Sequence, residues 1–219
     1  MKIIYEDDAI IVVDKPAGLA TQSAKVSEND LETELKKYRK KKGEAPEIYM
    51  VHRLDQPVSG LLLAAKIKEA AAVLSEDLKH DEFTKEYVAD IYKEADFVKE
   101  ATLIDYLLKD SRTNFSKVVK KETTGAKRAE LSYVTIEETE NTARLKILLK
   151  TGRHHQIRVQ LAHDNMPLLG DVKYGSEKSK AYSSEHNVRF VALRAAKIGF
   201  VHPITKKLMT FEDKGETNS

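Results

Sequence analysis

The chain contains no cysteine among its 219 residues, which excludes disulfide bonds, thiolate zinc sites and thiol catalysis. Its seven histidines never fall at a spacing typical of a metal site, so we expect no bound metal. The longest apolar run, Gly60 to Ala65, is too short to cross a bilayer. The first residues carry acids where a signal peptide needs a basic segment, and we therefore expect a soluble, cytoplasmic protein.

An excess of one charge is also missing. Lys and Arg number 37 against 35 Asp and Glu, a formal net charge of +2 in a chain whose residues are 33% charged. Such a balance does not by itself indicate a nucleic-acid partner, so the position of the basic residues has to decide. The length and a hydrophobic content of 41% suffice for a real core, and no repeat or linker divides the chain. We predict a single domain over residues 1–219.

The local patterns predict an α+β fold. Alternating and β-branched runs predict strands over residues 2–5, 9–14, 48–51, 60–66, 84–92, 128–137, 142–150, 194–201 and 206–212. Apolar residues at helical spacing predict helices over about 30–41, 68–79 and 154–163, the first capped by Asn29 or Asp30. Residues 109–124 lack periodicity and are expected to form a long loop or an irregular hairpin, and residues 175–187 a polar, exposed segment. Connections of hairpin type favour a mixed, largely antiparallel central sheet with flanking helices.

The first segment rich in functional groups surrounds Asp55. It reads Val51-His52-Arg53-Leu54-Asp55-Gln56-Pro57-Val58-Ser59-Gly60. Pro57 and Gly60 indicate a tight turn after a strand, from which an acid and a base two residues apart can project into a cleft. On residue types alone, a turn-forming or surface-paired Asp55 is the more usual explanation of the pattern.

Two further segments are rich in functional groups whose spacing matches neither a helix nor a strand. Lys150-Thr151-Gly152-Arg153-His154-His155-Gln156-Ile157-Arg158 places a glycine at a strand end and a group of donors at a helix start, which is a plausible phosphate site. Lys85-Glu86-Tyr87 opens a strand, where a tyrosine packed in the core is the ordinary interpretation.

Taken together, these segments resemble the RluA-type pseudouridine synthase family. The matching pieces run in the family's order across almost the whole chain: Ile11-Val12-Val13-Asp14-Lys15-Pro16-Ala17-Gly18-Leu19, His52-Arg53-Leu54-Asp55, Ser59-Gly60-Leu61-Leu62, Lys85-Glu86-Tyr87, Gly152-Arg153, His155-Gln156-Ile157-Arg158, Gly170-Asp171 and Tyr174-Gly175. Val58 stands where the family usually has Thr, and His154 where it usually has Thr or Ser. The chain looks like the short form of the family, without a preceding RNA-binding domain of the S4 type.

The resemblance implies the family's fold and the isomerisation of uridine to pseudouridine in RNA. Asp55 would be the aspartate needed to break the bond between uracil and ribose, either by attack on the sugar or by abstraction of a ribose proton. Arg158 would be its basic partner and keep the carboxylate ionised. Tyr87 would stack on the target base, and Arg53 would fill the gap left when that base is flipped out. No cofactor is needed, because isomerisation involves no redox chemistry.

The remaining expectations concern RNA contacts. The resemblance places the other members of its motifs at the substrate: His52, Gly152, Arg153, His155 and Gln156. Basic residues also gather in Lys36–Lys42 and in Lys109–Arg128, and such runs attract phosphate. We expect the second run to be an RNA-contacting loop through Lys117, Lys120 and Lys121, and leave the first between an RNA contact and a solvated helix face. The RNA would be ribosomal or transfer RNA, and the protein a monomer.

Two rival functions are open to the sequence. A hydrolase using Asp55 would need a second carboxylate at a fitting distance, for which only Glu86 or Asp171 could be proposed. A non-catalytic RNA-binding protein could keep the same fold, but binding to phosphates alone does not require an aspartate.

Overall fold

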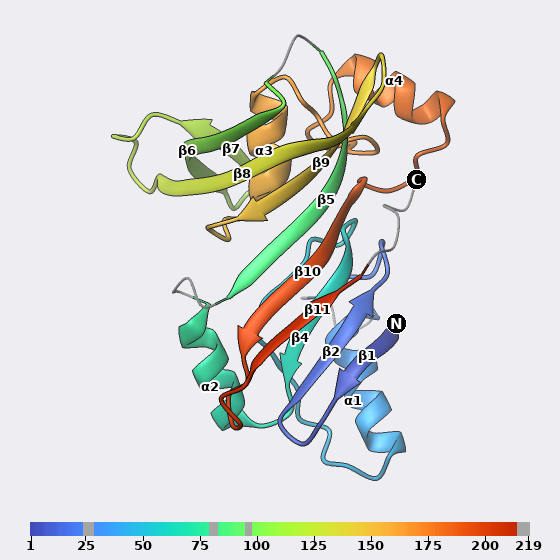
Figure 1. The fold of residues 1–219 in the computed structure, drawn as a ribbon, viewed down its shortest axis with the longest axis vertical. Helices are drawn as coiled ribbons and strands as arrows, with labels where there is room; N and C mark the ends of the chain where they lie inside the picture. Colours follow the sequence, from blue (N-terminus) through green and yellow to red (C-terminus); the bar gives the residue numbers. More distant parts are fainter. Residues whose placement is uncertain (24–28, 79–82, 95–97, 214–219) are drawn as a thin grey trace. The chain divides into compact units, whose positions relative to one another are not determined.

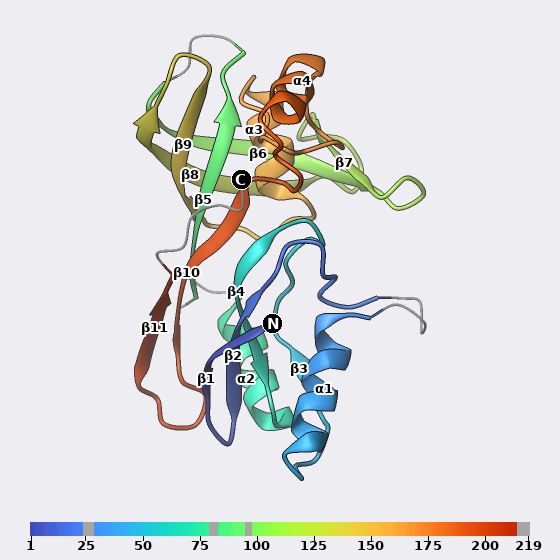
Figure 2. The same ribbon diagram turned by 90° about the vertical axis from the view of Figure 1, so that its right-hand side faces the viewer.

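The computed structural model describes residues 1–23, 29–78, 83–94 and 98–213 (Figures 1 and 2). The chain forms two compact units. Within the described residues, the first unit comprises 1–84 and 195–213, and the second comprises 85–194. In the part of the chain that is described, no helix is long and apolar enough to span a membrane.

The sheet of the first unit is built around two almost fully buried strands. They are β2 (Ile10–Lys15) and β4 (Ser59–Ala65), which pair antiparallel from Ile10 opposite Ala65 to Lys15 opposite Gly60. On one side, β1 (Lys2–Glu6) pairs with β2. On the other, β3 (Tyr49–Met50) and β10 (Leu193–Val201) lie next to β4, and β11 (Leu208–Glu212) pairs with β10. The expected hairpin between the first two strands is present, and its turn is closed by Asp7, whose Oδ1 accepts from the backbone N–H groups of Ala9 and Ile10 at 2.8 and 2.9 Å.

Two helices complete the first unit. Helix α1 (Leu31–Lys41) begins at Asp30, one of the two expected caps, whose carboxylate accepts from the N–H of Thr33 at 2.8 Å. Helix α2 (Lys68–Asp77) lies within its expected range and packs Ala70 and Leu74 into the strand core. The residue expected to end it, Lys79, falls outside the described residues.

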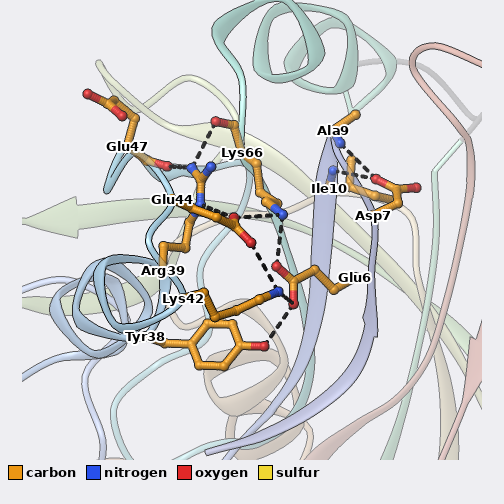
Figure 3. Close-up of polar contacts among 10 residues, drawn as sticks. All are labelled: Glu6, Asp7, Ala9, Ile10, Tyr38, Arg39, Lys42, Glu44, Glu47 and Lys66. Atoms are coloured by element: carbon orange, nitrogen blue, oxygen red, sulfur yellow. Dashed lines mark hydrogen bonds and ion pairs between the residues drawn. The ribbon is translucent and has the colours of Figure 1, made fainter.

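Part of the basic run of α1 and its cap belongs to an ion-pair network (Figure 3). Lys42 contacts both Glu6 of β1 and Glu44 at 3.0 Å, and Lys66 at the end of β4 contacts the same two carboxylates at 2.8 and 3.1 Å. Arg39 is buried, pairs with Glu44 at 3.1 Å, and donates to the backbone carbonyls of Glu47 and Lys66. These cations therefore fasten α1 to the sheet of its own unit.

The second unit contains an antiparallel sheet and two helices. The strand order is β5–β9–β8–β6–β7, with bounds Thr84–Tyr92, Thr142–Leu149, Lys127–Glu138, Glu100–Asp110 and Phe115–Val119. Helix α3 (Gln156–His163) packs against β6 and β7, with Val159 contacting Leu107 and Ala129. Figure 2 shows α3 and α4 (Glu177–Glu185) on the same side of β5, β8 and β9.

Two segments of this unit are more regular than the sequence indicated. Of the two alternatives for 109–124, a loop or an irregular hairpin, the structure has the hairpin: the end of β6, a tight turn and β7, so the basic run lies on it. Asn114 in the turn has a φ of 55°, a left-handed conformation that asparagine tolerates. The polar segment after Gly175 contains α4, which Ser176 caps by accepting from the N–H of Ser179. The largely antiparallel α+β fold itself is as predicted.

Candidate active site and RNA-contacting residues

Backbone hydrogen bonds hold the turn that carries Asp55 on both sides. The Thr21 hydroxyl donates to the carbonyl of Leu54 at 2.8 Å and accepts from its N–H at 3.2 Å. On the other side, Gly18 and Gln56 exchange two bonds, at 2.9 and 3.1 Å. The Asp55 carbonyl accepts from the N–H of Val58 at 3.0 Å, which closes the turn. Asp55 thus sits on a backbone with little freedom to move.

A buried ammonium group lies beneath this turn. Lys15 has no exposed surface, and its Nζ donates to the carbonyls of Pro16, Leu19 and Gln56 at 3.0, 2.6 and 3.3 Å. Burial lowers the pKa of Lys15 to about 8, although the nearby charges of Asp55 and Asp14 act in the opposite direction. The sequence motif contained this lysine, but its spacing gave no sign that it would support the aspartate turn.

The motif residues near Asp55 in the chain have different surroundings. Arg53 is exposed. His52 accepts from the N–H of Leu63 through Nε2 at 3.1 Å and packs edge-on against Phe83, so the contacts shown for this histidine are with the core. Gly60 has a φ of +114°, and a Cβ there would lie 2.4 Å from the carbonyl oxygen of Ala195, so the close strand contact requires glycine.

In the second unit, Arg158 forms a buried bidentate pair with Asp171. Arg158 Nε donates to Oδ2 at 2.7 Å and Nη2 to Oδ1 at 2.9 Å, with side-chain exposures of 5% and 1%. Burial acts to raise the pKa of Asp171. The bonds and charge of Arg158 and the N–H groups of Tyr174 and Lys173 outweigh this effect, so that pKa lies below its usual range. Our sequence analysis paired Arg158 with Asp55 and missed this role of Asp171, which lies thirteen positions further along the chain.

The segment before α3 is organised by Gln156. This side chain is 3% exposed, and its Oε1 accepts from the Thr151 hydroxyl at 2.8 Å and from the Arg153 N–H at 2.9 Å. Its Nε2 donates to the Glu130 carbonyl at 3.0 Å. The residue expected to bind substrate therefore makes contacts that shape the backbone around Gly152.

Other residues of the motifs are placed in the same unit. Arg153 is exposed and donates through Nε to the carbonyl of Arg128 at 2.8 Å. Lys85 lies beside Gly152, with its Nζ 3.8 Å from the position of a glycine Cβ, and burial lowers its pKa. Tyr87 is 6% exposed on β5, opposite Ile147 of β9.

The two histidines of this segment connect it to the β6–β7 hairpin. His155 adopts a left-handed conformation with a φ of 54°, and its Nδ1 lies 2.7 Å from the Tyr174 hydroxyl. His154 Nδ1 lies 2.8 Å from the Ser116 hydroxyl, and the two imidazoles stack with centroids 3.7 Å apart. Tyr174 also lies beside Arg158, 5.1 Å from its guanidinium carbon to the ring centre.

The three lysines expected to contact RNA lie on or just after β7. Lys117, Lys120 and Lys121 are exposed, and the ammonium of Lys121 lies 6.0 Å from the ring centre of Tyr106. Exposed cations on a hairpin can reach a phosphate backbone without breaking internal contacts.

Outside the motif residues, the part of the chain that the structure describes has a cavity but no group of three metal ligands. Among the described residues, no group of three His, Asp or Glu side chains is close enough to hold a metal ion. A cavity of about 300 Å³ in the second unit is lined by the carboxylates of Asp90, Glu137 and Glu138 together with Arg144 and α4 residues, and by none of the motif residues. Its acidic wall does not suit RNA phosphates.

Comparisons with known proteins agree with these motifs. Residues 9–163 match the family model described as RNA pseudouridylate synthase. The chain is 29% identical to tRNA pseudouridine synthase C of Pasteurella multocida, over 96% of this chain and 89% of the relative. It is 31% identical to ribosomal large subunit pseudouridine synthase D of Zymomonas mobilis, over 97% of this chain and 68% of the relative.

Solved structures show the same fold. Human RNA Pseudouridylate Synthase Domain Containing 1 superposes with a TM-score of 0.77 at 20% identity, over 98% of this chain and 83% of that one. The antiparallel sheet, the ordered motifs and these matches together show that the chain belongs to the RNA pseudouridylate synthase family and is an isomerase.

Proposed function

We propose that this protein converts specific uridines of transfer or ribosomal RNA to pseudouridine, with Asp55 as the catalytic carboxylate. The observation that carries the proposal is the Asp55 turn, held by bonds from Thr21 and Gly18 and supported by the buried Lys15. Catalysis requires the reacting carboxylate to be held in place. An aspartate on the surface of a protein that only binds RNA needs no such support. Relatives named for both kinds of RNA match the chain, so both substrates are retained.

The reaction is balanced within the substrate. The uridine leaves the base stack, because its C1′–N1 bond is unreachable within stacked RNA. That bond breaks, the uracil turns, and C1′ joins C5, while C5 loses a proton and N1 gains one. Asp55 would act at the sugar, as nucleophile at C1′ or as base for a ribose proton. The product has the mass of the substrate, and no electrons are exchanged.

Three further residues have roles in the proposed reaction. We propose that Arg158 is the basic partner of Asp55, because its bidentate bond to Asp171 fixes the plane of its permanently charged guanidinium. Tyr87 would stack on the flipped uracil, and the exposed Arg53 would occupy the gap left in the RNA.

The experiment compares Asp55→Asn with wild type on transfer RNA and ribosomal RNA fragments, and maps pseudouridine in cells that lack the protein. Removing a group that contacts reacting atoms should reduce turnover by about 10³-fold or more while the variant stays folded. Asp8→Asn serves as the matched control, because Asp8 is an exposed carboxylate of the same unit. Normal turnover by Asp55→Asn, or no change in any RNA site on deletion, would contradict the proposal.

A further inference from the structure

The hairpin strand β7 reverses the usual arrangement of apolar and polar side chains. Phe115, its first residue, is 42% exposed, whereas Ser116, the next residue, is 5% exposed. Successive side chains of a strand point to opposite faces, and burial normally selects the aromatic residue for the core. Here the hydroxyl is buried and the phenyl ring is displayed. The exposed Phe115 ring does not contribute the stabilisation that its full burial would give. This indicates a role other than packing in the core.

Ser116 is buried because it anchors the hairpin to the segment before α3. Its hydroxyl bonds with His154 Nδ1 at 2.8 Å, and its N–H donates to the Tyr174 hydroxyl at 2.9 Å. Lys173 adds a third tie by donating to the carbonyl of Asn114 in the hairpin turn at 2.7 Å. Three hydrogen bonds thus tie the start of β7 and its turn to His154, Lys173 and Tyr174.

These ties place Phe115 at the outer end of a row of planar groups. The row begins at the Arg158 guanidinium, 5.1 Å from the Tyr174 ring centre. Tyr174 meets Phe115 edge to face, with ring centres 5.4 Å apart and planes inclined by 67°. The Lys173 ammonium lies 4.3 Å from the centre of the Phe115 ring. The exposed ring is therefore two contacts away from the arginine proposed to act in catalysis.

An exposed aromatic ring among lysines is suited to an unpaired base of RNA. Bases stack on aromatic side chains irrespective of sequence, while neighbouring cations bind the phosphates. Lys117, two residues along β7, is exposed and lies on the same face of the strand as Phe115. A protein partner would be expected to cover a larger apolar surface than one ring framed by cations.

We propose that Phe115 is a stacking platform for an unpaired nucleotide that flanks the target uridine, with Lys117 at the adjoining phosphate. The proposal rests on the proposed function in that the ligand is the substrate RNA. It adds a residue that binds through its π-face, and it gives a reason for the His154–Ser116 bond: His154 sets the position of the platform.

The test separates stacking from phosphate binding by comparing Phe115→Leu, Phe115→Tyr and Lys117→Gln. Phe115→Leu keeps an apolar side chain without a π-face and should weaken RNA binding by about 5- to 100-fold. The slope of affinity against salt should stay as in wild type, because no phosphate contact is lost. Lys117→Gln should instead lower that slope by about 0.7 to 0.9. Phe115→Tyr should bind as wild type does.

A second readout uses the unaltered protein. Substrate RNA carrying 2-aminopurine at successive positions beside the target uridine should show quenching at one position with wild type and Phe115→Tyr, and none with Phe115→Leu. This readout still decides the matter if Phe115→Leu fails to fold, because no quenched position with wild type would overturn the proposal. Wild-type affinity of a folded Phe115→Leu variant, or equal weakening by Phe115→Tyr, would also overturn it.

The two proposals can fail separately. If wild type forms no pseudouridine in any RNA but Phe115→Leu still weakens RNA binding with an unchanged salt slope, the proposed function fails and the stacking site stands. If wild type is active and Phe115→Leu binds and quenches as wild type does, the stacking site fails and the proposed function stands.

Discussion

Each unit contains a cation withdrawn from water, and the two are held in opposite ways. Lys15 in the first unit donates to three neutral carbonyls, and burial lowers its pKa to about 8. Arg158 in the second unit faces the carboxylate of Asp171 through two short bonds, and the pKa of Asp171 is lowered. Both are buried positive charges, yet only the arginine is neutralised by a partner in direct contact.

The difference separates two uses of a buried cation. An arginine beside a carboxylate stays charged at every accessible pH and presents a fixed plane of donors. A lysine among carbonyls can lose its proton and remain a hydrogen-bond donor, so it mainly fixes backbone geometry. We therefore expect the second unit to depend on a permanent charge and the first on a set of hydrogen bonds.

The largest effect should come from breaking the Arg158–Asp171 pair. Asp171→Asn leaves a buried guanidinium without its carboxylate, which costs about 3–5 kcal/mol. Denaturant unfolding followed by circular dichroism measures the loss. Asp90→Asn is the matched control, because Asp90 also makes bidentate bonds, to an Arg144 that is 26% exposed. The control should lose about 1 kcal/mol or less, and an equal loss in both variants would show that burial of the pair is not what matters.

Lys15→Met should cost less at neutral pH and more in alkali. Three carbonyls lose their donor, but an ammonium no longer has to be buried, so we expect a loss of about 1 kcal/mol at pH 7. The folded pKa of about 8 lies below the ordinary 10.5, so the unfolded chain binds more protons between these values. The contribution of Lys15 to the unfolding free energy of wild type therefore increases with pH across that window.

The measurement for Lys15 is the difference in unfolding free energy between wild type and Lys15→Met at pH 7, 8, 9 and 10. A difference that grows with pH supports the comparison with Arg158, whereas a constant difference would contradict it. Turnover per folded molecule should change much less than stability, because the Thr21 and Gly18 bonds to the Asp55 turn remain.

The exposed cations of the two units should differ in RNA binding. Charge reversal of Lys117, Lys120 and Lys121 on the hairpin should weaken binding at least tenfold and flatten its salt slope by about 2 to 3. Reversal of Lys37, Lys40 and Lys41, which are exposed on α1, should change affinity less than about threefold. Filter binding at several salt concentrations measures both, and equal effects would make α1 a second RNA-binding surface.

The sequence predicted those parts of the molecule that depend on local pattern. The β-branched run of β2 and the Asp30 cap of α1 are recognisable because burial and capping act over a few neighbouring residues. The β6–β7 hairpin could be given only as an alternative to a loop, because β7 exposes Phe115 and buries Ser116, the reverse of the pattern that identifies a strand. Helix α4 was missed because it has no apolar stripe and buries Ser179 and Ser183 instead.

For the site, the segments were predictable and the partners were not. Asp55, Tyr87 and Arg158 could be selected from the order of the motifs. The buried partner of Arg158 could not, because Asp171 reaches it only after α3 and the following loop have folded. The contacts of Gln156 with Thr151 and Glu130 were likewise not predictable, and the role of Gln156 at the substrate stays a prediction.

The smallest expected effect concerns Glu44, a partly exposed carboxylate of the ion-pair network of the first unit. Hydrogen bonds from Lys42, Lys66 and Arg39 lower the pKa of Glu44 to about 2, compared with an ordinary 4.5. Its contribution to stability is therefore complete above about pH 4.5 and is lost as pH falls toward 2. Glu44→Gln should make acid unfolding slightly less steep in that window and change stability at pH 7 little, because Glu44 is itself partly exposed, Lys42 and Lys66 keep their pairs with Glu6, and Arg39 keeps its two carbonyl acceptors. Acid titrations of wild type and Glu44→Gln test this, with the more exposed Glu177→Gln as control. A large loss at pH 7 would mean that the first unit, like the second, depends on a charge in direct contact with its partner.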